Sequence, residues 1–363
     1  MSNDVKRTLV IAEAGVNHNG QFDLALKLVD AAADAGADVV KFQVFQAESL
    51  VSKSAQQAEY QVKNTGRTES QYQMLKKLEL SYEEHGRVAE YCQVKGVEYL
   101  STPFDSSSLR FLAEELQLET LKVPSGDLTN APLLLEFARS GKKLIVSTGM
   151  ATLADIEAAL SVLVWGMLNP DGSPNEHTDF GAAYFSVTGR ELLAQKVILL
   201  HCTTEYPAPF EDVNLTAMQT MSQAFRLPCG YSDHTQGIAV PVAAVALGAV
   251  VIEKHFTLSR EMEGPDHKAS LEPSELKEMI SSIREVEVSI GDGVKGPRPS
   301  EIANMPVARK SLTAAKSIEA GSIFCESDFV IMRPGSGTSP FQFWKLIGKP
   351  SRKAYEAGEL IDE

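Results

Sequence analysis

The sequence lacks the features of secreted and membrane-embedded proteins. None of its apolar stretches approaches the ~18 unbroken residues of a membrane-spanning helix. The first ten residues carry Asp4, Lys6 and Arg7, and the apolar core of a signal peptide does not follow them. The four cysteines form no CxxC pair, which favours free thiols in a reducing compartment. We therefore expect a cytoplasmic protein.

Positive charge is also scarce. The chain has 34 Lys and Arg residues against 48 Asp and Glu residues, for a formal net charge of −14. Such a balance argues against nucleic acid and anionic membranes as partners. A small anionic substrate remains compatible with it, because a pocket can be locally basic on an acidic protein.

Short apolar runs alternate with amphipathic helical patterns along most of the chain. Alternating strands and helices predict a parallel sheet, and eight units in roughly 290 residues are the size of a (β/α)₈ TIM barrel. An open doubly wound sheet is the alternative, but no G-x-G-x-x-G motif follows the first run. The eight strand-like runs cover residues 8–15, 38–45, 98–104, 120–126, 143–150, 197–207, 229–235 and 251–257.

Two features mark the ends of these units. Ser81 and Thr152 each precede an acidic residue by three positions, which predicts the start of a helix. Residues 46–68 and 165–188 show no clear pattern, and we expect two long loops there. In a TIM barrel, the loops that follow strands lie on the catalytic face.

The composition of the sequence changes after the last amphipathic helical pattern. We assign residues 1–288 to the barrel, the Gly- and Pro-rich residues 289–307 to a linker, and residues 308–363 to a small β-rich domain. A module of about 55 residues has a marginal core of its own. We therefore expect it to pack against something, possibly a second chain.

Two histidines follow the last two predicted strands at the point where each strand ends. His234 and His255 are 21 positions apart, enough for one helix and one strand. Neighbouring parallel strands would present both imidazoles at one end of the barrel, where they could ligate a divalent metal ion. The alternative is a pair of structural histidines, and Asp266, which follows at short range, does not decide between the two.

Two lysines lie inside apolar strands. Lys41 and Lys122 would both point into the mouth of the barrel, where buried ammonium groups need partners. A phosphate dianion between them would satisfy both, so we predict a cradle that binds phosphate and carboxylate groups. A Schiff base on Lys122 is the competing use. The cradle would comprise Lys41, Thr102, Lys122, Ser125 and Ser147.

Nine sequence blocks resemble the sialic acid synthase family of nonulosonate synthases, in the order of that family. The last residues resemble its antifreeze-like SAF domain, a β-clip fold, through ARKSL, AAKSIEAGSIF and FVIMRPGSG. The barrel blocks are AEAGVNHNG, VKFQVF, STPFD, KVPSGD, STGM, HCTTEYPAP, GYSDHT, EKHFT and GPDHKASLEP. One block alone would be weak, but nine in order are specific.

This resemblance implies an activity and its cofactor. The family condenses phosphoenolpyruvate with an N-acylated mannose-type sugar and water, releasing phosphate. It implies Mn²⁺, or alternatively Mg²⁺ or Co²⁺, on His234 and His255, where the ion also holds the sugar aldehyde oxygen. Phosphoenolpyruvate contacts carry over to the five cradle residues, of which Lys122 also counts among the catalytic residues.

Further roles carry over one residue at a time. Glu13 matches the acid near the reacting centre, where it would position or deprotonate water or stabilise a cation. Gln43 matches a position close to the substrates, and Tyr206 matches a sugar contact. Asp266 matches the acid after the second histidine and would bind substrate, or it could equally cap a loop. Arg333 matches an arginine that reaches the sugar's acyl group from the partner subunit of a domain-swapped homodimer.

One departure from the family bears on the sugar. N-acetylneuraminate-making members commonly have Asn and an apolar residue where this chain has Thr204 and Glu205. Glu205 could accept a hydrogen bond from an additional amide, which favours a 2,4-diacetamido sugar and N,N′-diacetyllegionaminate as product. N-acetylneuraminate and then pseudaminate synthesis are the alternatives.

Two other classes of function are less compatible with the sequence. An ice- or carbohydrate-binding protein would not need a lysine and serine cradle. A synthase acting on a phosphorylated sugar would need further basic residues, and the predicted strand ends carry few arginines.

Overall fold

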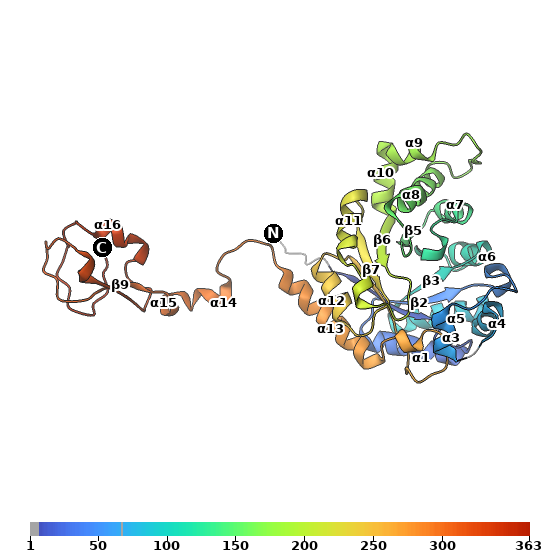
Figure 1. Ribbon diagram of the computed structural model, residues 1–363, viewed down its shortest axis with the longest axis horizontal. Coiled ribbons are helices and arrows are strands. Elements are labelled where there is room, and N and C mark those ends of the chain that lie inside the picture. Colours follow the sequence, from blue (N-terminus) through green and yellow to red (C-terminus); the bar gives the residue numbers. More distant parts are fainter. Residues whose placement is uncertain (1–6, 67) are drawn as a thin grey trace. The chain divides into compact units, whose positions relative to one another are not determined.

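The computed structural model describes residues 7–66 and 68–363 and divides the chain into two compact units, Met1–Gly291 and Asp292–Glu363 (Figure 1). The first unit contains eight parallel strands in the order β3-β2-β1-β8-β7-β6-β5-β4. The outermost strands of this order, β3 and β4, also contact each other, so the sheet closes into the predicted barrel. The strands are β1 (Leu9–Gly15), β2 (Val39–Val44), β3 (Glu98–Pro103), β4 (Thr120–Val123), β5 (Lys143–Ser147), β6 (Val197–Cys202), β7 (Cys229–Asp233) and β8 (Val251–His255).

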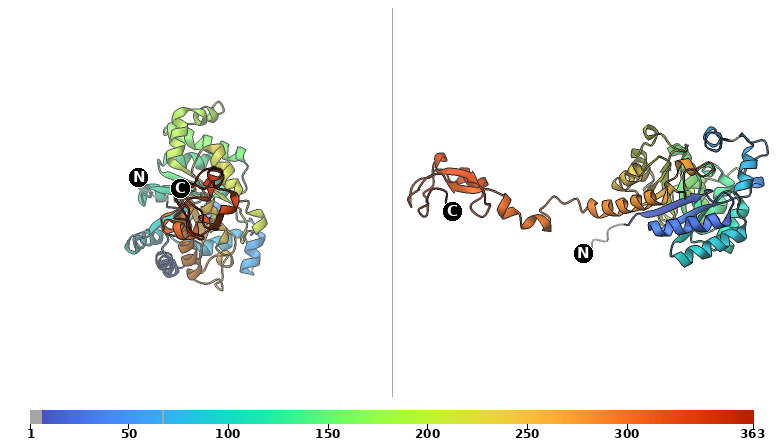
Figure 2. Two further views of the ribbon diagram at one scale, coloured as in Figure 1. Left: turned by 90° about the vertical axis from the view of Figure 1, so that its left-hand side faces the viewer. Right: turned by 90° about the horizontal axis from the view of Figure 1, so that it is seen from below.

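Helices surround the strands, and α13 packs against α1 and α12 on the outside of the barrel (Figure 2). The predicted caps are confirmed, since the Ser81 hydroxyl accepts from the Glu84 amide and the Thr152 hydroxyl from the Asp155 amide. The surrounding helices are α1 (Phe22–Ala35), α5 (Tyr82–Lys95), α6 (Ser106–Arg110) with the π-turn Phe111–Glu115, α7 (Ala131–Arg139), α8 (Leu153–Leu168), α10 (Val187–Lys196), α11 (Thr216–Phe225), α12 (Ala239–Ala246) and α13 (Pro273–Ile290).

The prediction of two long loops is wrong in part, because both segments contain helices. Residues 46–68 form α2 (Ala47–Leu50) and α3 (Glu59–Thr65), and α4 (Gln71–Leu78) follows. Residues 165–188 include the end of α8 and then α9 (Phe180–Phe185). The Asp179 carboxylate caps α9, and the Phe180 ring packs edge-on against the Trp165 ring. The helix depends on a cap and one aromatic contact, and neither produces the hydrophobic periodicity from which helices are predicted.

Alternation along the strands builds the barrel interior in layers. One inward layer is apolar and consists of Ile11, Val39, Leu100, Ile145, Leu200 and Val251. Two positions later, towards the carboxyl end of each strand, the inward residues are polar except for Cys202: Glu13, Lys41, Thr102, Ser147, Cys202 and Glu253. Because side chains alternate with a period of two, this shift places a polar floor directly above a closed apolar plug.

The second unit has its own small core. The strands β9 (Ser311–Ala314) and β10 (Phe329–Met332) pair antiparallel, and α16 (Phe343–Leu346) packs nearby. The predicted linker contains two short helices, α14 (Pro299–Ile302) and α15 (Met305–Ala308). The core residues of this unit are Leu312, Ala314, Ile318, Phe324, Phe329, Tyr355 and Ile361.

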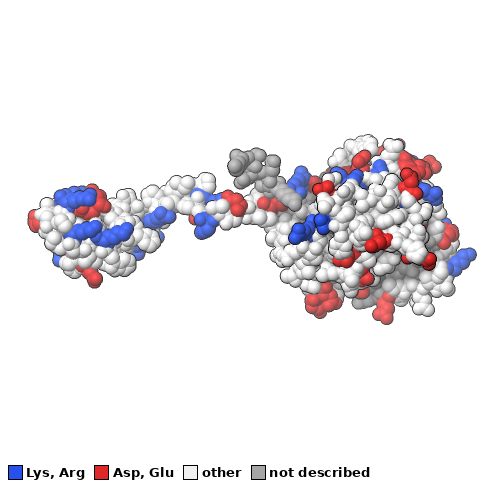
Figure 3. Space-filling model, turned by 90° about the horizontal axis from the view of Figure 1, so that it is seen from above, with Lys and Arg blue, Asp and Glu red and all other residues white. Residues whose placement is uncertain are grey.

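Acidic and basic side chains are interspersed over the face of the barrel unit in Figure 3. Among the residues that the structure describes, no helix is both long and apolar enough to cross a membrane.

Candidate active site

A cavity of about 230 Å³ opens at the carboxyl ends of the strands, above the polar floor. This is the end of a TIM barrel that carries catalytic residues. Most of the residues predicted from the sequence meet there. The lining comprises Glu13, Lys41, Gln43, Thr102, Phe104, Lys122, Pro124, Ser125, Gly126, Ser147, Met150, Cys202, Thr204, Tyr206, Ser232, His234, Glu253 and His255.

Four buried charges form the floor of this cavity. The Lys41 ammonium lies 2.9 Å from Glu13 Oε2 and 3.6 Å from Glu253 Oε2. The Lys122 ammonium lies 3.5 Å from Glu253 Oε1. Glu253 therefore sits between the two lysines, and the cluster of two cations and two carboxylates is neutral when all four are charged.

Sequence reasoning missed Glu253, although a signal was present. It lies two positions before His255 in β8, so both side chains face the same side of the strand. Its carboxylate also accepts a hydrogen bond from Ser232 Oγ at 2.8 Å. Two buried lysines need counter-charges, which is a signal in the sequence for a carboxylate on one of the remaining strands.

Burial and the lysines set the protonation of the two carboxylates. Burial raises the pKa of Glu13 to about 7; Lys41 opposes this shift, while Glu253 adds to it. For Glu253, burial alone would raise the pKa, but Lys122 and Lys41 together lower it to about 2. Glu253 is thus a permanent anion at neutral pH, whereas Glu13 can gain or lose a proton there.

Hydroxyl groups complete the predicted cradle. Lys41 Nζ donates to Thr102 Oγ1 at 3.1 Å, and Lys122 Nζ donates to Ser147 Oγ at 2.6 Å. Ser125 Oγ accepts from the Gly149 amide at 3.0 Å. The structure therefore brings all five cradle residues to one cavity, with ammonium, hydroxyl and amide groups together.

Gln43 lies beside Glu13, the acid expected near the reacting centre. Its Nε2 donates to Glu13 Oε1 at 3.3 Å, so the other oxygen of that carboxylate is the one that faces Lys41. Glu13 Oε2 accepts no well-aligned hydrogen bond despite the 2.9 Å approach of Lys41 Nζ, so this contact is mainly electrostatic.

The two predicted metal ligands lie next to each other, with their rings edge to face. The centres of the His234 and His255 rings are 5.6 Å apart, and the Tyr206 ring packs 4.2 Å from that of His234. His234 Nδ1 lies 2.5 Å from Thr203 O, where it donates, which leaves Nε2 as the basic nitrogen. His255 Nδ1 is buried without a hydrogen-bond partner.

The chemistry of these imidazoles fits a metal ion. Burial lowers the pKa of both rings, and for His255 the neighbouring His234 and Lys41 lower it further. Both are therefore neutral at physiological pH, as metal ligation requires. Among residues 7–66 and 68–363, no group of three or more His, Cys, Asp or Glu side chains has ligand geometry, so further ligands would come from substrate or water.

Among the described residues, buried side-chain atoms without a hydrogen-bond partner occur both at this cavity and elsewhere. Buried atoms without a hydrogen-bond partner include Glu13 Oε2, Thr204 Oγ1, Glu253 Oε2 and His255 Nδ1. All four belong to residues that line the cavity. The two carboxylate oxygens lie 2.9 and 3.6 Å from Lys41 Nζ, whereas Thr204 Oγ1 and His255 Nδ1 have no such charged neighbour and could bond to a polar ligand.

Two predicted site residues are not among those that line the cavity. Asp266 is buried just before the 3₁₀ turn His267–Ala269, and burial raises its pKa to about 6. Arg333 follows β10 in the second unit, where its Nε donates to Ala308 O at 3.0 Å. Glu205 is exposed and also outside the lining, whereas Thr204 lines the cavity. Of the two residues that depart from the family pattern, only Thr204 lines the cavity.

Comparison with known proteins identifies the family of the chain. The NeuB family model matches residues 28–295, most of the chain. The chain belongs to the NeuB family. This NeuB-family chain is 48% identical to the N,N′-diacetyllegionaminic acid synthase of Campylobacter jejuni subsp. jejuni serotype O:2 over 359 residues, 99% of this chain and 100% of that protein.

More distant NeuB relatives also match over most of their length. The N-acetylneuraminate-9-phosphate synthase of Homo sapiens is 32% identical and covers 98% of this chain, with 91% of its own length matched. The crystal structure of N-acetylneuraminic acid synthetase from Leptospira borgpetersenii serovar Hardjo-bovis, in complex with citrate, superposes with a TM-score of 0.66. It is 32% identical, and the match covers 84% of this chain and 93% of that one.

Proposed function

We propose that this protein is a nonulosonate synthase. It joins phosphoenolpyruvate to an N-acylated mannose-type sugar, adds water and releases phosphate. The observation that carries this proposal is the full-length similarity to N,N′-diacetyllegionaminic acid synthase, at 48% identity. The cavity supports it independently, because two buried lysines and several hydroxyls suit an anionic substrate.

Phosphoenolpyruvate would bind on the polar floor. Its phosphate and carboxylate need cationic and hydroxyl donors, which Lys41, Lys122 and Ser147 supply. In the free protein these lysines are paired with Glu13 and Glu253. An incoming anion therefore competes with the two carboxylates for the lysines.

His234 and His255 would hold the divalent ion, which we propose to be Mn²⁺, with Mg²⁺ or Co²⁺ as alternatives. When bound, the ion supplies Lewis-acid polarisation of the sugar aldehyde. The chain fixes the site through the hydrogen bond from His234 Nδ1 to Thr203 O, which aims Nε2 at the cavity. Tyr206 stacks on His234 and closes one side.

Glu13 would handle the proton of the attacking water. Carbon–carbon bond formation at C3 of phosphoenolpyruvate leaves C2 electron-poor, and water adds there. A carboxylate with a pKa of about 7 is matched to accepting that proton near neutral pH. Gln43 holds one oxygen of Glu13, and the other lies 2.9 Å from the Lys41 ammonium on the floor of the cavity.

The sugar we favour is 2,4-diacetamido-2,4,6-trideoxymannose, which gives N,N′-diacetyllegionaminate. The similarity to the legionaminic acid synthases and the unpartnered Thr204 hydroxyl support this choice. The test compares phosphate release with this sugar, N-acetylmannosamine and the pseudaminate precursor at equal Mn²⁺. We expect the highest kcat/KM for the diacetamido sugar; faster turnover of N-acetylmannosamine would establish N-acetylneuraminate synthesis instead.

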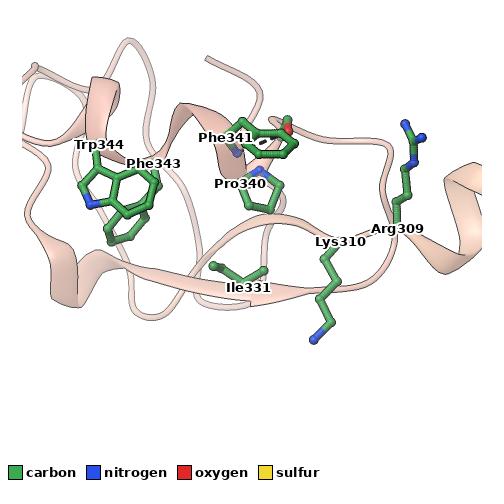
Figure 4. A pocket seen from close by; sticks show the side chains of 8 residues that line it. Arg309, Lys310, Ile331, Pro340, Phe341, Phe343 and Trp344 are labelled. Carbon is green, nitrogen blue, oxygen red and sulfur yellow. Dashed lines mark hydrogen bonds between the residues drawn. The ribbon is translucent and has the colours of Figure 1, made fainter.

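We also propose a domain-swapped homodimer in which Arg333 reaches the sugar of the partner subunit. Support comes from an apolar face on the second unit, where Phe341 and Trp344 have 87% and 77% of their surfaces exposed. Figure 4 shows these rings with Phe343, Pro340 and Ile331 around a hollow. A face of this kind marks a protein interface.

A further inference from the structure

A second buried ion pair lies immediately behind the candidate metal ligands. Lys254 Nζ and Asp233 Oδ2 are 2.6 Å apart, and both side chains are 0% exposed. Each partner directly precedes one of the histidines, since Asp233 precedes His234 and Lys254 precedes His255. Neither residue lines the cavity, so the pair has no direct access to a substrate there.

The strand register explains why this pair can act on both rings. Asp233 of β7 and Lys254 of β8 are directly opposite each other in the parallel ladder. Side chains alternate along a strand, so these two point to the helix side while their neighbours face the cavity. The ion pair therefore ties together the two strands at the level from which the imidazoles emerge.

The same pair also fixes the backbone beyond β7. Lys254 Nζ donates to Thr235 O, and Asp233 accepts from the Thr235 amide at 3.0 Å and from the Thr235 hydroxyl at 3.1 Å. His234 is thus held on both sides, by Asp233 before it and by Thr235 after it. These contacts are local and specific, unlike general apolar packing.

A contribution to the stability of the fold does not explain why this ion pair is buried. Removing two charges from water is costly, and replacing a buried ion pair by apolar residues of similar size is often neutral or stabilising. Directional contacts are instead suited to fixing geometry. His255 needs this most, because its Nδ1 has no hydrogen-bond partner to orient the ring, so its position depends on the backbone that carries it.

We propose that Asp233 and Lys254 are positioning residues that hold His234 and His255 at the separation at which both bind one divalent ion. This inference rests on the proposed metal site. It assigns a role to a buried pair that touches neither substrate nor metal. It also predicts that metal affinity, rather than binding of phosphoenolpyruvate, depends on the pair.

The test measures Mn²⁺ affinity of metal-free protein by isothermal titration calorimetry, with the melting temperature recorded in parallel. The double variant Asp233→Asn/Lys254→Met removes both charges and leaves none unpaired. We expect its Kd for Mn²⁺ to rise about 10- to 100-fold, the usual effect of losing the partners that orient metal ligands. The isosteric single variant Asp233→Asn, which keeps the side-chain shape, should also bind Mn²⁺ more weakly.

The control removes a different ion pair, whose side chains are 26% and 18% exposed and whose arginine also lies 2.7 Å from Glu287. Arg284 and Asp38 are 2.7 Å apart, and Asp38 also accepts from the Val10 amide near the start of β1, far along the strands from the histidines. Asp38→Asn/Arg284→Met should lower the melting temperature without changing the Kd for Mn²⁺. If the Asp233 and Lys254 variants likewise melt earlier but bind Mn²⁺ as the wild type does, the positioning role is refuted. If the wild type itself binds no Mn²⁺, both this inference and the proposed metal site are wrong.

Discussion

Replacing Glu253 by glutamine removes the carboxylate that lies between the two lysines of the cavity. The lysine ammonium groups are 3.5 and 3.6 Å from its oxygens, and all three groups are buried. At an effective dielectric constant of ~20, each such pair gains roughly 5 kcal/mol of Coulomb energy. Desolvation offsets much of this gain, and breaking a buried pair by losing one partner costs about 3–5 kcal/mol.

We therefore expect Glu253→Gln to lower the melting temperature by on the order of 6–15 °C at neutral pH. An anion on the lysines should replace the lost charge. Phosphate should bind more tightly to the variant, in which the two lysines lack a counter-charge, than to the wild type. Saturating inorganic phosphate should therefore raise the melting temperature of Glu253→Gln more than that of the wild type. The assay is thermal unfolding with and without phosphate, followed by the KM for phosphoenolpyruvate.

A matched control separates this effect from general loss of a buried carboxylate. Glu287 is also buried and lies 2.7 Å from Arg284, and it accepts from the Thr8 amide at the opposite end of the barrel. Glu287→Gln should lower the melting temperature equally with and without phosphate. If phosphate stabilises Glu253→Gln no more than the wild type, the assignment of the lysines to a phosphate cradle is refuted.

The remaining predictions concern proton transfer, the sugar and the lysine chemistry. Burial raises the pKa of Glu13 to about 7, and the base form is the active one, so kcat/KM should rise with pH through about 7. Glu13→Gln should lose this pH dependence together with most of kcat. If the rise with pH persists in Glu13→Gln, it belongs to another group. Thr204→Val should raise the KM for the sugar and leave the KM for phosphoenolpyruvate unchanged, in a steady-state assay that varies each substrate. Arg333→Ala should raise the KM for the sugar alone, and unchanged kinetics would rule out the proposed contact across the dimer. Borohydride treatment with substrate should leave Lys122 unmodified by mass spectrometry, since a reduced adduct would show a Schiff base instead.

Much of the barrel and its floor was predictable from the sequence because both depend on local alternation. Lys41 and Lys122 stand out in apolar strands, and the inward side of a strand is fixed by its neighbours two positions away. Glu253 and Lys254 were harder to assign, since they are adjacent charged residues that look like the polar end of a strand. Only the structure separates them, with one facing the cavity and the other facing the helices.

The positions that sequence alone could not place lie outside the regular strands. Glu205 and Thr204 are neighbours after β6, and local propensity does not determine which of them turns towards the cavity. Asp266 lies in a loop shaped by tertiary contacts, such as the hydrogen bond between Thr257 Oγ1 and His267 Nδ1 at 2.7 Å. The helix at 180–185 depends on a cap and on Trp165, which is distant from it in sequence.

The most direct measurement of the central claim is phosphate release from phosphoenolpyruvate by chelator-treated protein, with the diacetamido sugar present and Mn²⁺ added back in steps. Two neutral, buried imidazoles at the cavity predict negligible release without the ion and full recovery on its return. Undiminished release by the metal-free protein would contradict the assignment of His234 and His255 as the ligands of a required ion.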